Sequence, residues 1–328
     1  MSKGILLVNL GSPDSTEVED VRTYLREFLM DPKVIDSPWL IRKFVVELAI
    51  LPKRPIESAK AYEKIWTQDG SPLIIYSKKL QTKVQHAIDV PVELAMRYKN
   101  PSIEFGLQQL YNKGVSEVLV IPLYPQYTMS TTETVAEKVV QLQKKKFKDM
   151  EVKFLKAFYN HPDYVKVLGD SIKENLPADF DQLLLSYHGI PERHDRKALA
   201  FGKRAKIPIV AYREQCYETT RLVSEYLQLP EDKVTTSFQS RLGRDPWIQP
   251  YTDVILENFP KEGVKKIAVC TPAFVADCLE TLEEISMEGR EDFLAAGGEE
   301  FTYIPCLNDR DDWTQVLIKW INGWLSNR

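Results

Sequence analysis

The sequence has no excess of basic residues, and this excludes one broad class of function. Its 328 residues contain 43 Lys and Arg against 47 Asp and Glu, a formal net charge of −4. Non-specific nucleic-acid binding depends on surplus Lys and Arg that neutralise phosphates. We therefore expect no nucleic-acid partner.

Cysteine is also scarce. The chain has no Cys-x-x-Cys pair and no tight cysteine cluster; its four cysteines are Cys216, Cys270, Cys278 and Cys306. This spacing favours neither a disulfide framework nor a structural zinc site. Buried free thiols in a reducing compartment are the simplest interpretation.

No apolar stretch is long enough to cross a membrane. The longest, from Trp39 to Leu51, is interrupted by Arg42, Lys43 and Glu47, whereas a span needs about 20 apolar residues. The chain starts in a strand-like run without the pattern of a signal peptide. We expect a cytoplasmic protein, with peripheral membrane contact through residues 39–51 left open.

Three common catalytic motifs are absent as well. The sequence contains no Gly-x-Gly-x-x-Gly, no P-loop and no Gly-x-Ser-x-Gly. Nucleotide cofactors and an acyl-transfer serine therefore lose support.

What the chain does have is a regular alternation of short apolar runs and helical patterns. The runs are continuous, as in strands covered on both faces, and they predict strands at 4–10, 90–96, 117–123, 151–155, 182–187, 234–238, 266–271 and 302–304. Helices are expected at 39–51, 102–113, 132–146, 163–174, 214–227, 246–258 and 311–324. This alternation predicts an α/β fold with doubly wound parallel sheets.

The chain also repeats itself weakly. Residues 5–13 resemble residues 183–191, and residues 114–120 resemble residues 263–269. The order of these anchors predicts two similar Rossmann-like halves, 1–175 and 176–328. The first half is longer, and the natural place for its insertion is near residues 30–70. A long insertion there is either functional, at the mouth of a cleft, or a packed surface helix, and both alternatives stay open.

Ligands of open α/β sheets bind beyond the carboxyl ends of the strands, and one histidine lies there. His188 follows a predicted buried strand and precedes Gly189-Ile190-Pro191. Of the other three histidines, His86 and His161 are expected at the surface, and His194 lies in a polar run that favours solvation. His188 is therefore the candidate for chemistry.

A row of carboxylates starts at another strand-end loop. Glu280, Glu284 and Glu288 are spaced by four and would form one stripe on a helix. A solvated helix face is the simpler explanation of such a stripe. A row leading into a cleft would instead suit a hard or borderline divalent cation.

A third cluster is aromatic and polar. Tyr124 and Tyr127 lie on the loop before the predicted helix 132–146, where Ser130 to Thr132 supply a helix cap. The cap accounts for the hydroxyl residues but leaves the two tyrosines as candidates for ligand contact.

Taken together, these segments resemble the ferrochelatase family across almost the whole chain. The run Leu184-Leu185-Ser186-Tyr187-His188-Gly189-Ile190-Pro191 resembles the family's signature around its active-site histidine. The other matches fall in the family's order: residues 8–13, 97–98, 124–127, 130–132, 246–247 and 274–282.

The resemblance implies a function and its site. Such an enzyme inserts Fe²⁺ into protoporphyrin IX, releases two protons and forms protohaem, the terminal step of haem biosynthesis. By resemblance, His188 and Glu280 face each other across the porphyrin in a cleft between the halves and serve as catalytic and metal residues, while Glu284 and Glu288 belong to a metal path. The porphyrin contacts implied are Leu10, Arg54, Tyr62, Tyr127 and Trp247.

The chain departs from the family at two informative positions. Cys278 stands where many relatives have a second histidine, so a metal-relay role there is in doubt. Met129 occupies the position of a mid-chain cluster cysteine, and the chain stops at Arg328. We therefore expect no [2Fe–2S] cluster and no permanently bound cofactor, with Fe²⁺ as a substrate.

Several alternatives stay open at this point. Leu10 favours protoporphyrin over coproporphyrin by resemblance, and the division of tasks between His188 and Glu280 is open. A related chelatase that inserts cobalt or iron into another tetrapyrrole, and a porphyrin carrier without turnover, are the rival functions. Partners from the haem pathway are also compatible with the sequence.

Overall fold

The computed structural model describes residues 2–206, 208–241, 243 and 245–326. In these residues eight strands form two four-stranded sheets, and the named strands all pair in parallel. The α/β class is thereby confirmed. The strands are β1 (Lys3–Asn9), β2 (Val92–Met96), β3 (Glu117–Pro122), β4 (Glu151–Phe154), β5 (Gln182–His188), β6 (Val234–Gln239), β7 (Lys266–Cys270) and β8 (Glu300–Tyr303).

The two sheets have the same internal order. The first sheet has the order β2-β1-β3-β4 and the second β6-β5-β7-β8. If the strands of each sheet are numbered along the chain, both sheets have the order 2-1-3-4. The central strands β1 and β5 are almost fully buried, because helices cover both faces of each sheet. The expectation of two similar α/β halves is confirmed by this topology.

The chain folds into two compact units. The first comprises Met1–Leu123, Met129–Lys156 and Asp309–Arg328, and the second comprises Tyr124–Thr128 and Ala157–Asn308. Each unit therefore draws on more than one stretch of the chain. The simpler division into 1–175 and 176–328 stays a prediction.

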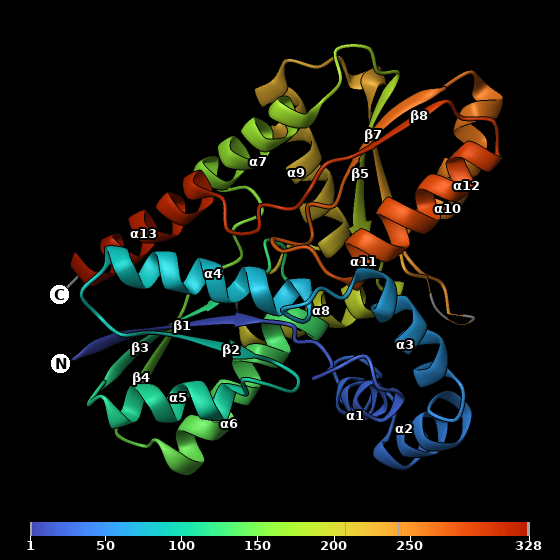
Figure 1. Ribbon diagram of the computed structural model, residues 1–328. Helices are drawn as coiled ribbons and strands as arrows, with labels where there is room; N and C mark the ends of the chain where they lie inside the picture. The colour runs from blue at the N-terminus through green and yellow to red at the C-terminus, as the bar shows by residue number, and fades with distance from the viewer. Residues whose placement is uncertain (1, 207, 242, 244, 327–328) are drawn as a thin grey trace. The chain divides into compact units, whose positions relative to one another are not determined.

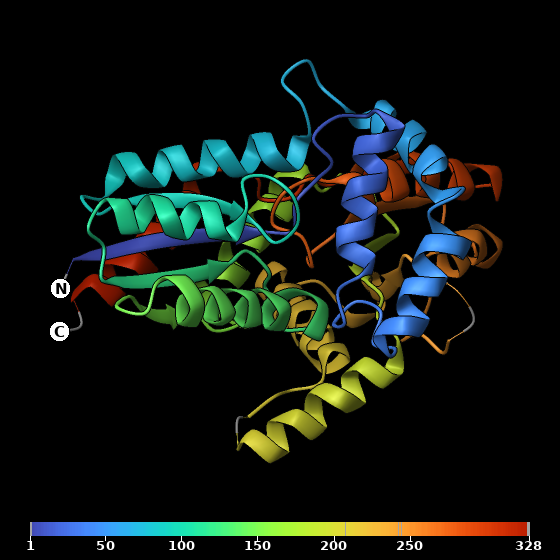
Figure 2. The same cartoon turned by 90° about the horizontal axis from the view of Figure 1, so that it is seen from below.

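In the first unit, helices cover both faces of the sheet (Figure 1). Helices α4 and α13 lie on one face, and α5 and α6 lie on the other. Helices α1, α2 and α3 group together at the carboxyl end of β1, as Figure 2 also shows. The bounds are α1 (Val18–Leu29), α2 (Trp39–Phe44), η1 (Val45–Ile50), α3 (Arg54–Ile65), α4 (Pro72–Ala87), α5 (Ile103–Asn112), η2 (Met129–Glu133), α6 (Thr134–Lys146) and α13 (Asp311–Ser326).

The second unit is built in the same way. Helices α7 and α9 cover one face of its sheet, while α10 and α12 cover the other (Figure 1). Helix α8 extends away from the body of this unit (Figure 2). The bounds are α7 (Pro162–Asn175), α8 (Glu192–Ala205), α9 (Tyr212–Leu227), η3 (Glu231–Lys233), α10 (Thr252–Asn258), η4 (Phe259–Glu262), α11 (Leu279–Thr281), η5 (Leu282–Gly289) and α12 (Arg290–Ala295).

The apolar segment 39–51 is helical, as expected, but changes its winding. It starts as the α-helix α2 and continues as the π-helix η1. Val46 and Leu51 pack against Leu29 in a small core, and the buried Arg42 side chain donates to the carbonyl oxygens of Ile35 and Ser37. Among the residues that the structure describes, no helix is long and apolar enough to span a bilayer.

The helix expected at 246–258 is wrong in its first half, because α10 begins only at Thr252. Pro250 cannot donate a backbone hydrogen bond, and the segment before α10 is held by strand-like contacts. Phe238 N donates to Pro250 O at 2.8 Å, and Ile248 N donates to Ile190 O at 3.1 Å. Residues 246–251 therefore lie beside β6 and the loop after β5.

Candidate functional site

The end of β5 places His188 at the carboxyl edge of the second sheet. His188 is the register partner of Gln239, the last residue of β6. Gly189 then donates its N–H to Gln239 O at 2.8 Å. A Cβ at position 189 would lie 2.8 Å from that same oxygen, so only glycine allows the two strand ends to approach this closely.

The tautomer of His188 follows from its hydrogen bond. Its Nδ1 lies 2.6 Å from Gly189 O, and a carbonyl oxygen can only accept, so Nδ1 carries the proton. In the neutral ring the lone pair is therefore on Nε2, where it can take a proton or a metal ion. The half-buried ring lies between Trp247 and Phe274, with centroid distances of 6.5 and 6.2 Å.

The loop after β7 positions Glu280. Cys278 caps the short helix α11: its N–H donates to Thr281 Oγ1 at 2.9 Å. The Thr281 hydroxyl in turn donates to Asp277 Oδ1 at 3.1 Å, and Tyr303 Oη donates to the same oxygen at 2.5 Å. The buried Asp277 carboxylate thus fixes the backbone from which the half-buried Glu280 side chain extends.

Glu284 on η5 is the best-defined carboxylate of the acidic row. Its Oε2 accepts from Ser240 Oγ at 2.5 Å and from Gln239 Nε2 at 3.1 Å. Burial raises the pKa of the Glu284 carboxyl; the Ser240 hydrogen bond and the His188 ring act in the opposite direction, and the charge of Glu280 raises it. His188, Glu280 and Glu284 therefore interact electrostatically within one unit.

Glu288 differs from the other two because its side chain is exposed. The acidic row runs from the half-buried Glu280 and Glu284 to the solvent at Glu288, along α11 and η5. The alternative of a fully solvated helix face is wrong for Glu284. Within the described ranges, no group of three or more His, Cys, Asp and Glu side chains is close enough to hold a metal ion.

Two further candidates belong to the second unit. Trp247 pairs with Pro191 in an isolated bridge beside the His188 loop. Tyr127 lies on the Tyr124–Thr128 segment and is held by Gln215 of α9, with Tyr127 N donating to Gln215 Oε1 at 2.8 Å.

The remaining three candidates belong to the first unit. Leu10 is half-buried directly after β1. Tyr62 is buried on α3, with its ring edge-on to Tyr24 and Trp66. Arg54, at the start of α3, is exposed and lies 3.8 Å from Glu57. These positions are described within their own unit only.

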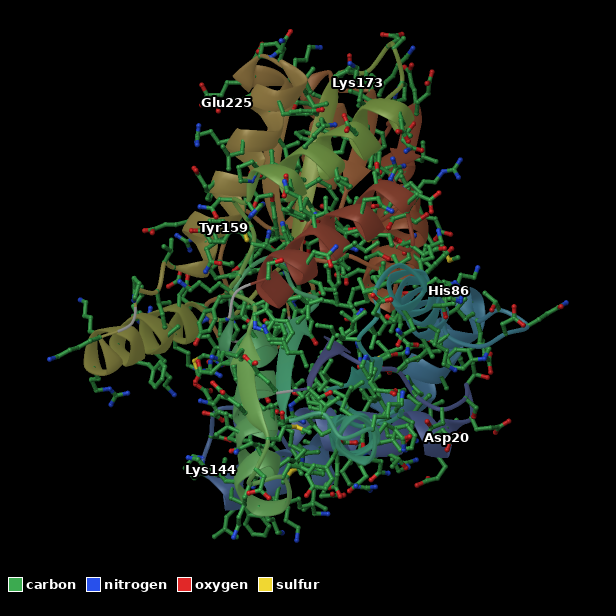
Figure 3. All side chains as sticks on the ribbon, turned by 90° about the vertical axis from the view of Figure 1, so that its left-hand side faces the viewer. Asp20, His86, Lys144, Tyr159, Lys173 and Glu225 are labelled. Carbon is green, nitrogen blue, oxygen red and sulfur yellow. The ribbon has the colours of Figure 1, made fainter. Side chains whose placement is uncertain are left out.

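The other histidines divide as follows. His86 on α4 is exposed, as expected (Figure 3), and so is His161 before α7. His194 is 3% exposed on α8, so the expected solvation of its polar run is wrong for this residue. The buried positions His194, Ala198 and Gly202 recur every four residues, which is the inner stripe of a helix.

Gln239 and Ser240 are site residues that were not predicted from the sequence. Both contact Glu284, and the Gln239 amide also donates to Glu280 O at 2.7 Å. Their signal was available: two polar residues directly follow a predicted strand, so they had to lie at the same sheet edge as His188.

A family model described as Ferrochelatase matches residues 2–324 of the chain. A ferrochelatase of Pseudomonas putida strain F1 is 46% identical over 327 residues, covering 95% of this chain and 96% of that protein. A ferrochelatase of Pseudomonas fluorescens strain Pf0-1 is 49% identical over 326 residues, covering 95% of each.

Two solved structures share the fold at low sequence identity. SirB from Bacillus subtilis, with Fe³⁺, aligns with a TM-score of 0.57 at 13% identity and covers 100% of this chain and 97% of its own. CbiX, the terminal enzyme for siroheme biosynthesis in denitrifying bacteria, aligns with a TM-score of 0.51 at 12% identity, covering 98% and 100%.

Proposed function

The chain belongs to the ferrochelatase family, and we propose on that basis that it inserts Fe²⁺ into protoporphyrin IX, forms protohaem and releases two protons. It is a metal-inserting enzyme, and the reaction is the terminal step of haem biosynthesis. The observation that carries the assignment of residues is the grouping of His188 with Glu280 and Glu284 at one edge of the second sheet.

The geometry suggests a division of tasks. Porphyrin metallation must remove two pyrrole protons and deliver iron to four nitrogens. Since Nδ1 of His188 donates to Gly189 O, Nε2 of the neutral imidazole is the nitrogen that can accept a pyrrole proton. Carboxylate oxygens suit Fe²⁺ before it is dehydrated, so we assign iron delivery to Glu280 and Glu284, with Glu288 at the solvent end of the path.

By resemblance to the family, the proposed porphyrin contacts are Leu10, Arg54, Tyr62, Tyr127 and Trp247. A macrocycle is large and apolar with two propionates, which fits aromatic and aliphatic side chains together with one exposed guanidinium that can pair with a carboxylate. Gripping the ring in a bent shape would expose the nitrogen lone pairs, at a strain on the order of 1–5 kcal/mol.

Iron is proposed as a substrate of this chain and not as a permanently bound cofactor. All four cysteines are buried free thiols, and they lie on separate segments of the chain, which supports the proposal that no [2Fe–2S] cluster is resident. Burial also raises the pKa of the Cys278 thiol, which disfavours a thiolate that would bind metal at that position.

We further propose a cytoplasmic protein with peripheral membrane contact through residues 39–51. The side chains of Trp39, Leu40, Ile41, Phe44 and Leu48 are all more than half exposed, an unusual concentration on one helix. Lys43 lies 5.0 Å from the Trp39 ring. An apolar face beside basic residues is the pattern of helices that lie in a bilayer surface.

The deciding experiment mixes protein, Fe²⁺ and protoporphyrin IX without oxygen and follows the loss of porphyrin fluorescence. We expect catalysed loss with protoporphyrin and slower loss with coproporphyrin. Quenching that stops at one equivalent of porphyrin would identify a carrier. Faster turnover of cobalt with a less aromatic tetrapyrrole would identify the rival chelatase.

A further inference from the structure

Gln239 contacts three parts of the site, two through its side-chain amide and one through its backbone oxygen. Its Nε2 donates to Glu280 O at 2.7 Å and to Glu284 Oε2 at 3.1 Å, and its backbone oxygen accepts from Gly189 N. Glu280 O is a carbonyl and can only accept, so the NH₂ group must face the acidic segment. A flipped amide would place oxygen against oxygen at both contacts.

A buried chain of hydroxyls lies behind this amide. Ser186 Oγ donates to Gln239 Oε1 at 2.9 Å and lies 2.8 Å from Thr252 Oγ1. Thr252 Oγ1 in turn lies 2.8 Å from Ser237 Oγ. None of these side chains is more than 4% exposed, and they come from β5, β6 and the start of α10.

The direction of this chain is fixed by counting protons. Each hydroxyl has one hydrogen to donate. The hydrogen of Ser186 goes to Gln239 Oε1, so the Ser186 oxygen must accept from Thr252. Thr252 has then used its hydrogen and must accept from Ser237. All donors therefore point from Ser237 through Thr252 and Ser186 towards Gln239 and the carboxylate of Glu284.

We propose that Gln239 is a positioning residue for metal delivery, held in its productive orientation by the Ser237–Thr252–Ser186 chain. It fixes Glu284 and the backbone of Glu280 against the strand end that carries His188. This inference rests on the proposed function, because only a metal-inserting enzyme delivers a metal ion. The three hydroxyls of Ser237, Thr252 and Ser186 act only through Gln239 and not by contact with iron or porphyrin.

The polar chain is not needed for packing alone. Buried hydroxyls are costly unless every one is satisfied, and a valine fills the volume of a threonine. The same sheet provides a matched comparison: Thr236 is also buried on β6, and its Oγ1 donates to Thr220 Oγ1 at 2.8 Å. Among the described residues, no hydrogen bond joins that pair to Gln239, so the pair serves as a core comparison.

The test compares Thr252→Val, Thr252→Ser and Thr236→Val in the full chain. Thr252→Val removes the donor to Ser186 and breaks the chain two links from Gln239, while Thr252→Ser keeps the hydroxyl. We expect Thr252→Val to raise the KM for Fe²⁺ about tenfold, the effect of one lost buried hydrogen bond, with the KM for porphyrin unchanged. Thr252→Ser and Thr236→Val should both keep the KM for Fe²⁺ of the parent.

A second measurement does not depend on turnover. Calorimetric titration of Co²⁺ into the protein alone should show binding about tenfold weaker in Thr252→Val than in Thr236→Val. Ser186→Ala, which removes the hydroxyl next to Gln239, should weaken Co²⁺ binding in the same way. If Thr252→Val does not fold, Ser186→Ala takes its place in the comparison. Thermal melting of every variant reports the cost to the core separately.

The outcomes separate the two proposals. Equal effects of Thr252→Val and Thr236→Val on the KM for Fe²⁺ and on Co²⁺ affinity would overturn the positioning role. A KM for Fe²⁺ in Thr252→Ser that is as high as in Thr252→Val would overturn it as well. Absence of turnover in the parent chain would overturn the proposed function instead, and the Co²⁺ titration would still decide the role of Gln239.

Discussion

Tyr212 Oη donates a hydrogen bond of 2.8 Å to the carbonyl oxygen of His188. Tyr212 begins α9 and is 4% exposed, and burial raises the pKa of its hydroxyl well above the ordinary value. The phenol therefore stays a neutral donor at any pH used for an assay, and it ties the histidine backbone to a helix rather than to the sheet alone.

Replacing this donor should loosen the histidine. We expect Tyr212→Phe to cost about 1 kcal/mol of unfolding free energy and to lower kcat severalfold, because His188 O loses its anchor. Urea denaturation and steady-state turnover measure the two effects. Tyr187→Phe is the matched control, since the fully buried Tyr187 hydroxyl pairs with Thr220 Oγ1 at 3.0 Å. It should lose similar stability with kcat unchanged, and equal losses of kcat would contradict a specific role for Tyr212.

Substitutions of His188 and Glu280 should affect metal insertion and leave porphyrin binding intact. We expect His188→Ala and Glu280→Ala each to abolish metal insertion, by more than a hundredfold in kcat, while porphyrin still binds. Porphyrin fluorescence titration and anaerobic turnover distinguish the two steps. His86→Ala, at an exposed position on α4, is the control for removal of an imidazole. Near-normal rates in His188→Ala would remove His188 from the mechanism.

Glu284 should make the folded protein less stable as the pH rises. Its pKa in the folded state lies above the ordinary glutamate value because of burial, so the folded state holds this proton more tightly than the unfolded state. The unfolding free energy therefore falls as pH rises through the interval between the ordinary and the raised pKa. Above that interval the full penalty is present.

Glu284→Gln should remove that penalty. The Gln oxygen can still accept from Ser240 and Gln239, so we expect a higher melting temperature than the parent at pH 8 and little difference near pH 4, with slower metal insertion. Scanning calorimetry across that range measures it. The exposed Glu291→Gln on α12 should show no such pH-dependent gain. A melting temperature that falls at pH 8 would mean that burial does not dominate at Glu284.

The apolar face of α2 and η1 should govern membrane contact. Phe44 and Leu48 are 65% and 63% exposed, so changing both to serine removes apolar area that no core contact uses. We expect the double variant to lose co-sedimentation with vesicles that contain anionic lipid while its melting temperature stays unchanged. Phe105→Ser, at an exposed position on α5, is the matched control. Unchanged sedimentation of the double variant would exclude this surface.

The sheets could be predicted from sequence because their signal is local. Each strand is a short continuous apolar run, and all eight predicted runs overlap strands in the described residues. The sequence does not predict helices α1, α3, α4 and α8. In α8, five Lys and Arg residues flank a narrow inner stripe, so the local pattern indicates a solvated polar run and does not indicate that His194 is buried.

The site could be predicted only in part for a related reason. The position of His188 follows from one strand and one turn, which adjacent residues encode. The environment of Glu284 depends on Gln239 and Ser240, which lie more than 40 residues away in sequence and reach it only through the strand order β6-β5-β7. Neither the burial of Glu284 nor the direction of the hydroxyl chain behind Gln239 is encoded in a local pattern.

The four buried cysteines allow local opening of the native structure to be measured by thiol alkylation. Burial raises the pKa of the Cys216, Cys270, Cys278 and Cys306 thiols, so the native protein offers almost no thiolate to an alkylating reagent. Labelling therefore requires the structure around a thiol to open. The rate at which each thiol is modified then reports the opening of its own segment, which is α9 for Cys216, β7 for Cys270 and a loop for Cys278 and for Cys306, without any probe being added to the protein.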